Sequence, residues 1–321
     1  AEIRAQTGLE QIELIGLDAC LMGHVEVFDA LAPHARYAVA SQETEPALGW
    51  AYTQFLAELT ANPAMSGGDL ARVIVDSYID DDQRIIDDEA RADLLRQGAP
   101  LGGLLGLLGG PSADQLAQQM GQGITLTAID LAAMGELMDS LNDLAYTLQG
   151  QSQQGVARAR NFAQSYTSIF GKDVPPSYID LGNFVQLLKK ESGGGDLARA
   201  ADGVLDSLNR AVIAEKHGPK KPGSTGISIY FPNSQLYQSP LTGPESYTAI
   251  ARRFASESLW DEYLTFHYTG RPFEAAPSTV ATPEPAAAIR APGAGEIEVS
   301  PITLSDSVAT ITDPVLLSTD I

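Results

Sequence analysis

Short apolar runs alternate with one helical stripe over the first fifty residues of the chain. Residues 12–17 and 37–40 are apolar runs of the length expected for strands buried in a sheet. Between them lies a stripe with the spacing of an amphipathic helix, made of Leu21, Val25, Phe28 and Leu31. Two strands joined by one helix are expected to be parallel, with a right-handed connection. The segment therefore predicts a β-α-β unit.

Helical patterns dominate the rest of the chain. We predict helices over residues 53–95, 126–148 and 197–215, and a strand over 226–232 that stops at a proline. The run 178–181 leads into a further helical stretch, and residues 97–113, rich in Gly and Leu, are expected to be a loop or an insertion. These elements predict an α/β fold with a mostly parallel sheet.

Composition divides the chain into three parts. Residues 1–270 are predicted to form one α/β domain, because 44% of the chain is hydrophobic and can build a large core. Residues 271–295 are rich in Pro and Ala and are expected to be a linker. Residues 296–321 contain two strand-like runs and are predicted to be an incomplete β segment.

The charge balance narrows the set of partners. The chain has 20 basic and 41 acidic residues, a net charge of −21, which disfavours nucleic acid and anionic membranes as ligands. No run of 18 apolar residues is present, so no membrane span is predicted. The N-terminus lacks the features of a signal peptide, but we interpret Ala1 as a processed or artificial end, which carries no information on export.

The single cysteine is the sharpest chemical feature. Cys20 stands where the first predicted strand ends and the helix begins, at the edge of the sheet where α/β proteins bind ligands. A helix N-terminus also favours a thiolate. However, a lone cysteine is more often a small buried hydrophobe. Position alone leaves both interpretations open.

Several motifs resemble those of the clostripain family of cysteine peptidases. The run Asp18-Ala19-Cys20-Leu21-Met22-Gly23 is similar to the nucleophile motif of that family. Four further segments follow in the order seen in the family: 39–52, 124–131, 178–181 and 226–232. The resemblance spans about residues 9–268.

The resemblance implies a caspase-like α/β/α sandwich whose N-terminal strands are missing from this chain. It implies a cysteine endopeptidase that cleaves after Arg or Lys through a Cys–His dyad, with peptides and proteins as substrates. Cys20 would be the nucleophile, its backbone N–H one oxyanion donor, and Asp18 the acid that recognises the basic side chain.

Three more residues are candidates for substrate binding. Glu43 and Glu45 follow the next strand and could add negative charge to the same pocket, although solvated side chains are the simpler interpretation. Trp50 could line the cleft or pack in the core. Ala51 departs from the family pattern, because many relatives have a polar or acidic residue there.

The dyad histidine of the family belongs to a His-Gly motif at the end of the strand before the nucleophile. None of the first 19 residues is histidine, and none of the four histidines His24, His34, His217 and His267 fits that position. His217 precedes a glycine, but no strand is predicted before it. The resemblance therefore implies that an upstream segment or an N-terminal light chain supplies the base, and that a cut after a basic residue creates Ala1. The alternative is a catalytically inactive member that binds peptides or partner proteins.

Two acidic runs, 80–82 and 87–89, raise the question of a metal. Carboxylates are ligands that Ca²⁺ prefers, but the spacing fits no EF-hand loop, and a solvated helix face is the simpler interpretation. We therefore predict no metal-binding residue and no certain cofactor, and leave Ca²⁺ open. We expect a secreted or cell-envelope location, with the cytoplasm not excluded.

Overall fold

The computed structural model describes residues 8–98, 111–168, 174–275, 303–304 and 317–318. Two compact units divide between Pro285 and Ala286. In the second unit, β7 (Thr303–Leu304) and β8 (Leu317–Ser318) form an antiparallel pair. Most of the predicted linker 271–295 and of the predicted loop 97–113 lies outside the described residues, and the domain boundaries remain predictions.

The predicted β-α-β unit is confirmed. Strands β1 (Ile12–Leu17) and β2 (Ala35–Ala40) are parallel neighbours and are joined by helix α2 (Val25–Leu31). Their last residues, Leu17 and Ala40, lie opposite each other in the register. The segments that follow the two strands therefore emerge at the same edge of the sheet.

The sheet is mixed rather than mostly parallel, which corrects the prediction. Its order is β1-β2-β3-β5, and β3 (Thr125–Asp130) and β5 (Val212–His217) each run antiparallel to the preceding strand in this order. Both strands overlap the helices predicted over 126–148 and 197–215. Side chains of β3 are buried on both faces of the sheet, so its burial does not distinguish a strand from a buried helix, and β5 follows α12 without a break.

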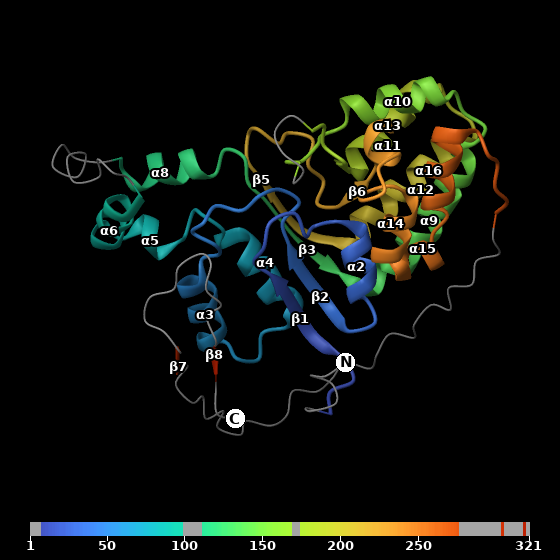
Figure 1. Cartoon of the computed structure of the whole chain (residues 1–321). Helices are drawn as coiled ribbons and strands as arrows, with labels where there is room; N and C mark the ends of the chain where they lie inside the picture. Colours follow the sequence, from blue (N-terminus) through green and yellow to red (C-terminus); the bar gives the residue numbers. More distant parts are fainter. Residues whose placement is uncertain (1–7, 99–110, 169–173, 276–302, 305–316, 319–321) are drawn as a thin grey trace. The chain divides into compact units, whose positions relative to one another are not determined.

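Helices cover both faces of the sheet, which confirms the α/β fold with a three-layer arrangement (Figure 1). Helix α4 (Gly67–Ser77) packs on one face, against side chains such as Val39 and Leu126. Helices α2 and α12 (Asp196–Ala211) pack on the other, where Ile129 contributes to the core, and α9 (Met134–Leu148) packs on α12.

A second, two-stranded sheet joins the late motifs. Strands β4 (Tyr178–Asp180) and β6 (Ser228–Tyr230) are antiparallel, and the backbone N–H of Ser228 donates to the carbonyl oxygen of Gly23 at 3.0 Å. This contact ties the second sheet to the segment after Cys20.

The remaining helices surround these two sheets. They are α3 (Tyr52–Ala61), α5 (Gln83–Ile86), α6 (Asp88–Gly98), α8 (Ala113–Met120), η1 (Leu131–Ala133), α10 (Gln153–Phe162), α11 (Leu181–Ser192), α13 (Ser234–Tyr237), α14 (Pro244–Ile250), α15 (Arg252–Glu257) and α16 (Trp260–Thr269). Across the described ranges, no helix combines the length and apolar character that crossing a bilayer requires.

Candidate functional site

Cys20 lies in a turn between β1 and α2. Helix α2 begins only at Val25, so the thiol is not at a helix N-terminus, which corrects the predicted placement. The segment that follows β2 holds this turn in place. The N–H of Leu21 donates to the carbonyl oxygen of Glu43 at 3.1 Å, and the N–H of Gly23 donates to the carbonyl oxygen of Ser41 at 2.7 Å. Hydrogen bonds to the segment after β2 therefore fix the position of Cys20.

Gly23 allows this close approach. A Cβ at Gly23 would lie 2.8 Å from the backbone N of Gln42 and 2.8 Å from the carbonyl carbon of Ser41, both rigidly placed. We predict that Gly23→Ala displaces the Cys20 turn and lowers the free energy of unfolding by about 1–3 kcal/mol. Gly123→Ala is the matched control, since a Cβ there meets nothing within 4 Å. Urea unfolding of both variants measures the effect, and equal stabilities would contradict the prediction.

The thiol is exposed and has one backbone contact. The N–H of Glu45 points to the Sγ of Cys20 at 3.3 Å. The sulfur is therefore accessible from solvent, and the carboxyl group of Glu45 contacts Trp50 and Asp18. This arrangement contradicts the interpretation of Cys20 as a buried packing residue.

A cluster of acidic and aromatic side chains lies beside the thiol; we call Asp18, Glu45, Trp50 and Tyr52 the acidic cluster. The indole N–H of Trp50 donates to the Oε1 of Glu45 at 3.2 Å, and its backbone N–H points to the Oδ2 of Asp18 at 3.4 Å. The hydroxyl of Tyr52 donates to the same Oδ2 at 3.0 Å. Gly49 has φ of 69° and passes so close that a Cβ would lie 2.9 Å from this oxygen. The two carboxyl groups thus contact residues 49–52.

The acidic cluster has one carboxyl group that retains its proton. Burial and a hydrogen bond to Asp18 raise the pKa of Glu45 to about 8, partly offset by the indole of Trp50. Two carboxylates at hydrogen-bonding distance repel each other, so one of them holds a proton near neutral pH. A cation entering the cluster would relieve this repulsion.

Glu43 lies apart from the acidic cluster. Its side chain is buried, forms an ion pair with Lys221, and accepts hydrogen bonds from the backbone N–H groups of Thr44 and Thr167. Burial raises the pKa of Glu43, but the hydrogen bonds to Lys221 and Thr167 outweigh it, so the pKa is lowered overall. Its charge is balanced inside the protein, and we leave Glu43 out of the substrate-binding set. Trp50 packs in the core, one of its two predicted roles, and its indole N–H also reaches Glu45; its role in the substrate cleft stays a prediction.

None of the four histidines, all of which are described, forms a hydrogen bond with Cys20. His24 contacts the carboxylate of Glu26 at 3.0 Å, and His217 that of Glu215 at 2.9 Å. The imidazole of His267 contacts Gln153 at 2.7 Å, and burial together with Arg160 lowers its pKa to about 4. His34 follows α2, at the opposite end of β2 from the Cys20 turn.

His217 requires a correction. It ends strand β5, although no strand was predicted before the His-Gly pair. It pairs with Thr125, so it lies at the same edge of the sheet as Cys20. However, β5 is three strands from β1, which corresponds to about 14 Å across the sheet. His217 is therefore too far away to take a proton from the thiol directly.

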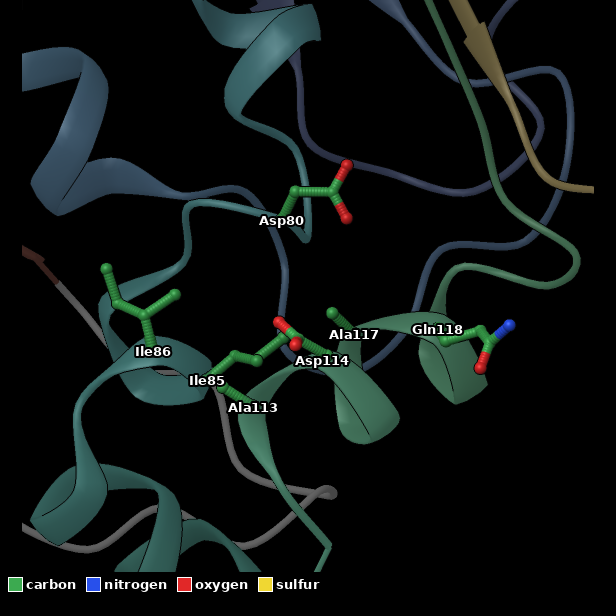
Figure 2. A pocket seen from close by; sticks show the side chains of 7 residues that line it. All are labelled: Asp80, Ile85, Ile86, Ala113, Asp114, Ala117 and Gln118. Carbon is green, nitrogen blue, oxygen red and sulfur yellow. The ribbon is translucent and has the colours of Figure 1, made fainter.

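The acidic runs have protein partners. Asp82 caps α5 and pairs with Arg84, Asp80 pairs with Lys216, and Asp88 pairs with Arg91. Figure 2 shows Asp80 with Asp114 at a pocket of about 610 Å³ between α5 and α8. Within the described ranges, no three His, Cys, Asp or Glu side chains come together as a metal site would require. Dependence on Ca²⁺ remains untested.

Two residues of this region were missed by the sequence prediction. Tyr52 belongs to a segment that resembles the family, but nothing in the sequence indicated its bond to Asp18. Asp180, fully buried, accepts hydrogen bonds from Gln42, Tyr166 and Thr225 and so connects the second sheet to the segment after β2. The sequence indicated a role for Asp180 only through its place in segment 178–181, which resembles the clostripain family.

Comparisons with known proteins find the same family that the motif around Cys20 resembles. The sequence profile of the clostripain family (Peptidase_C11) matches residues 2–94. A comparison with curated protein sequences finds no match.

Solved structures with a similar arrangement include a cysteine protease from B. fragilis, with 16% identity over 83% of this chain and 92% of that chain, at a TM-score of 0.45. An inactive zymogen of a C11 protease from Parabacteroides distasonis has 13% identity over 82% of this chain and 61% of that chain, at a TM-score of 0.48. At such identities and TM-scores below 0.5, these likenesses add no weight to a function. The family match shows that residues 2–94, the segment with Cys20 and the acidic cluster, are similar to the clostripain family.

Proposed function

We propose that this chain carries the nucleophile of a cysteine endopeptidase that cleaves after Arg or Lys. One observation carries the proposal: Glu45 places its backbone N–H on the exposed sulfur of Cys20 and its carboxyl group against Asp18. A reactive thiol and a site for a cationic side chain are thereby held together by a single residue.

The acidic cluster supports a basic side chain at the residue before the cleaved bond. Asp18 and Glu45 offer carboxylate oxygens to a guanidinium or ammonium group, which forms strong charge-assisted hydrogen bonds with such acceptors. Tyr52 and Trp50 donate to the same carboxyl groups and fix their directions. Ala51 adds no charge, so Asp18 and Glu45 supply the recognition in this chain.

The chemistry follows from the thiol. The sulfur attacks the peptide carbonyl carbon, the amine leaves with a proton from an imidazolium, and water then hydrolyses the thioester to release the acid and restore the thiol. We propose that this imidazole comes from outside residues 1–321. The positions of the four histidines support this, as does the place of β1 at one end of the described sheet, where its outer edge can accept a further strand.

Peptide hydrolysis tests the proposal. We expect the isolated chain to show no turnover of peptides with Arg or Lys before the cleaved bond. Adding the segment encoded before Ala1 should restore turnover. If the isolated chain is active and His217→Ala abolishes that activity, the base lies within the chain and the proposed division is wrong.

A catalytically inactive, peptide-binding protein is the second candidate, favoured by the lack of a histidine at Cys20 in the described structure. It predicts that peptides with basic side chains bind but are never cleaved, whichever flanking segment is added. The same hydrolysis experiment therefore separates the two functions.

The pKa of Glu45 predicts how binding of a cation depends on pH. Below pH 8 Glu45 is protonated and uncharged; above pH 8 it adds a negative charge to the acidic cluster. The affinity for a guanidinium ligand should therefore rise by about tenfold between pH 6.5 and 9. Calorimetry of Glu45→Gln should show no such rise, and a parallel rise in both proteins would exclude Glu45 as its source.

A further inference from the structure

Tyr78 has a buried hydroxyl without a partner. The residue follows α4, its side chain is fully buried, and no group in the described structure forms a hydrogen bond with its hydroxyl. A buried polar group without a partner is destabilising, and each one in a native protein needs an explanation. A ligand that completes the bond is such an explanation.

Tyr78 lies in the core that also holds the ring of Trp50, a member of the acidic cluster. Tyr78 packs in the same apolar core as Trp50 and Leu48, and the indole N–H of Trp50 leads from that core to Glu45. The nearby guanidinium of Arg84 donates to the carbonyl of Trp50 at 3.0 Å, which holds the Tyr78 segment against this loop. Burial raises the pKa of Tyr78, and the charges of Glu45, Asp18 and Cys20 raise it further, so these groups are within electrostatic reach of the hydroxyl.

The backbone around Tyr78 is strained and firmly held. Ile79 has φ of 71°, a left-handed conformation that a β-branched residue rarely adopts. In the described ranges, the other non-glycine residue with positive φ is Leu21, directly after Cys20. Lys216 fixes the carbonyl of Tyr78 from outside at 2.7 Å. Strain of this kind persists where surrounding structure imposes it, and it is concentrated at ligand sites.

We propose that the Tyr78 hydroxyl is the inner, uncharged ligand of the acidic cluster and accepts an N–H from the guanidinium or ammonium group of the bound side chain. This inference rests on the proposed function, because it assumes that a basic side chain enters between Asp18 and Glu45. It adds a specificity-determining residue. A side chain without an N–H leaves the hydroxyl unpaired, whereas a guanidinium or ammonium group satisfies it, so Tyr78 increases discrimination without adding charge.

Calorimetry on the full chain tests the inference with two probes, Nα-acetyl-arginine methylamide and its norleucine analogue, whose side chain has no N–H. For Tyr78→Phe we expect about tenfold weaker binding of the arginine probe. Binding of the norleucine probe should not change, and the melting temperature should be unchanged or higher, because the variant lacks the unpaired hydroxyl. Tyr263→Phe is the matched control, since Tyr263 is also fully buried but lies in α16 and its hydroxyl donates to Gln153. It should bind both probes like the wild type.

Unchanged binding of the arginine probe by Tyr78→Phe overturns the inference, and so does the absence of binding by the wild type. A lower melting temperature with equal losses for both probes would indicate a packing role and overturns it too. Failure of the proposed function is detected separately, by treating the wild type with a peptidyl-arginine chloromethyl ketone. If that reagent labels Cys20 selectively while Tyr78→Phe binds normally, only the inference about Tyr78 fails.

Discussion

Replacing Cys20 with alanine is expected to abolish cleavage after Arg and Lys in the natural protein, with kcat/KM falling by about 10⁴-fold or more. The thioester cannot form without the sulfur, and no other cysteine exists in the chain to replace it. The melting temperature should not change, because the thiol is exposed and its one hydrogen bond is with the N–H of Glu45. Initial rates on a peptide with Arg before the cleaved bond measure the effect.

Met22→Ala is the control for this variant, because Met22 is exposed in the same turn. It should keep most of the activity. If Cys20→Ala instead retains the turnover of the wild type, Cys20 is not the nucleophile.

Asp18→Asn should produce the second largest effect. The substitution keeps the shape of the side chain and an oxygen that can accept a hydrogen bond from Tyr52. It removes the negative charge of Asp18, whereas Glu45 is charged only after it loses its proton. We expect kcat/KM for peptides with Arg to fall by about 100-fold, since the loss of one charged partner costs 2–5 kcal/mol. Peptides with norleucine at the same position should be cleaved at an unchanged, low rate.

Asp114→Asn provides the matched control, because it removes an equal charge at the pocket between α5 and α8. Its rates should equal those of the wild type. Equal losses for Arg and norleucine peptides in Asp18→Asn would mean that Asp18 supports the turn rather than recognises charge.

The first half of the fold could be predicted from local pattern. Strand β1 has the predicted bounds, and its parallel pairing with β2 follows from the short helical connection. Strand β3 could not be recognised, because Leu126 and Ile129 are buried on opposite faces of the sheet and resemble a helix core. Strand β5 could not be recognised because it follows α12 without a break. The direction of these strands depends on long connections that periodicity does not describe.

The candidate site could be predicted in part for the same reason. Asp18 and Glu45 follow parallel neighbours, whose carboxyl ends share one edge of the sheet. The different fate of Glu43 could not be foreseen, because its partner Lys221 comes from a distant segment. Tyr78 gave no signal either, since a tyrosine near the end of a helix looks like any core residue until its hydroxyl is found without a partner.

We propose that a reactive Cys20 lies beside a site for a positive charge. Mass spectrometry of the intact chain after treatment with a peptidyl-arginine chloromethyl ketone and with its citrulline analogue tests it most directly, because the single cysteine makes the labelled position unambiguous. We predict one label per chain, formed at least about tenfold faster by the arginine reagent, with that advantage lost in Asp18→Asn. Equal labelling rates for the two reagents, at the rate of a cysteine in an unstructured peptide, would contradict the account.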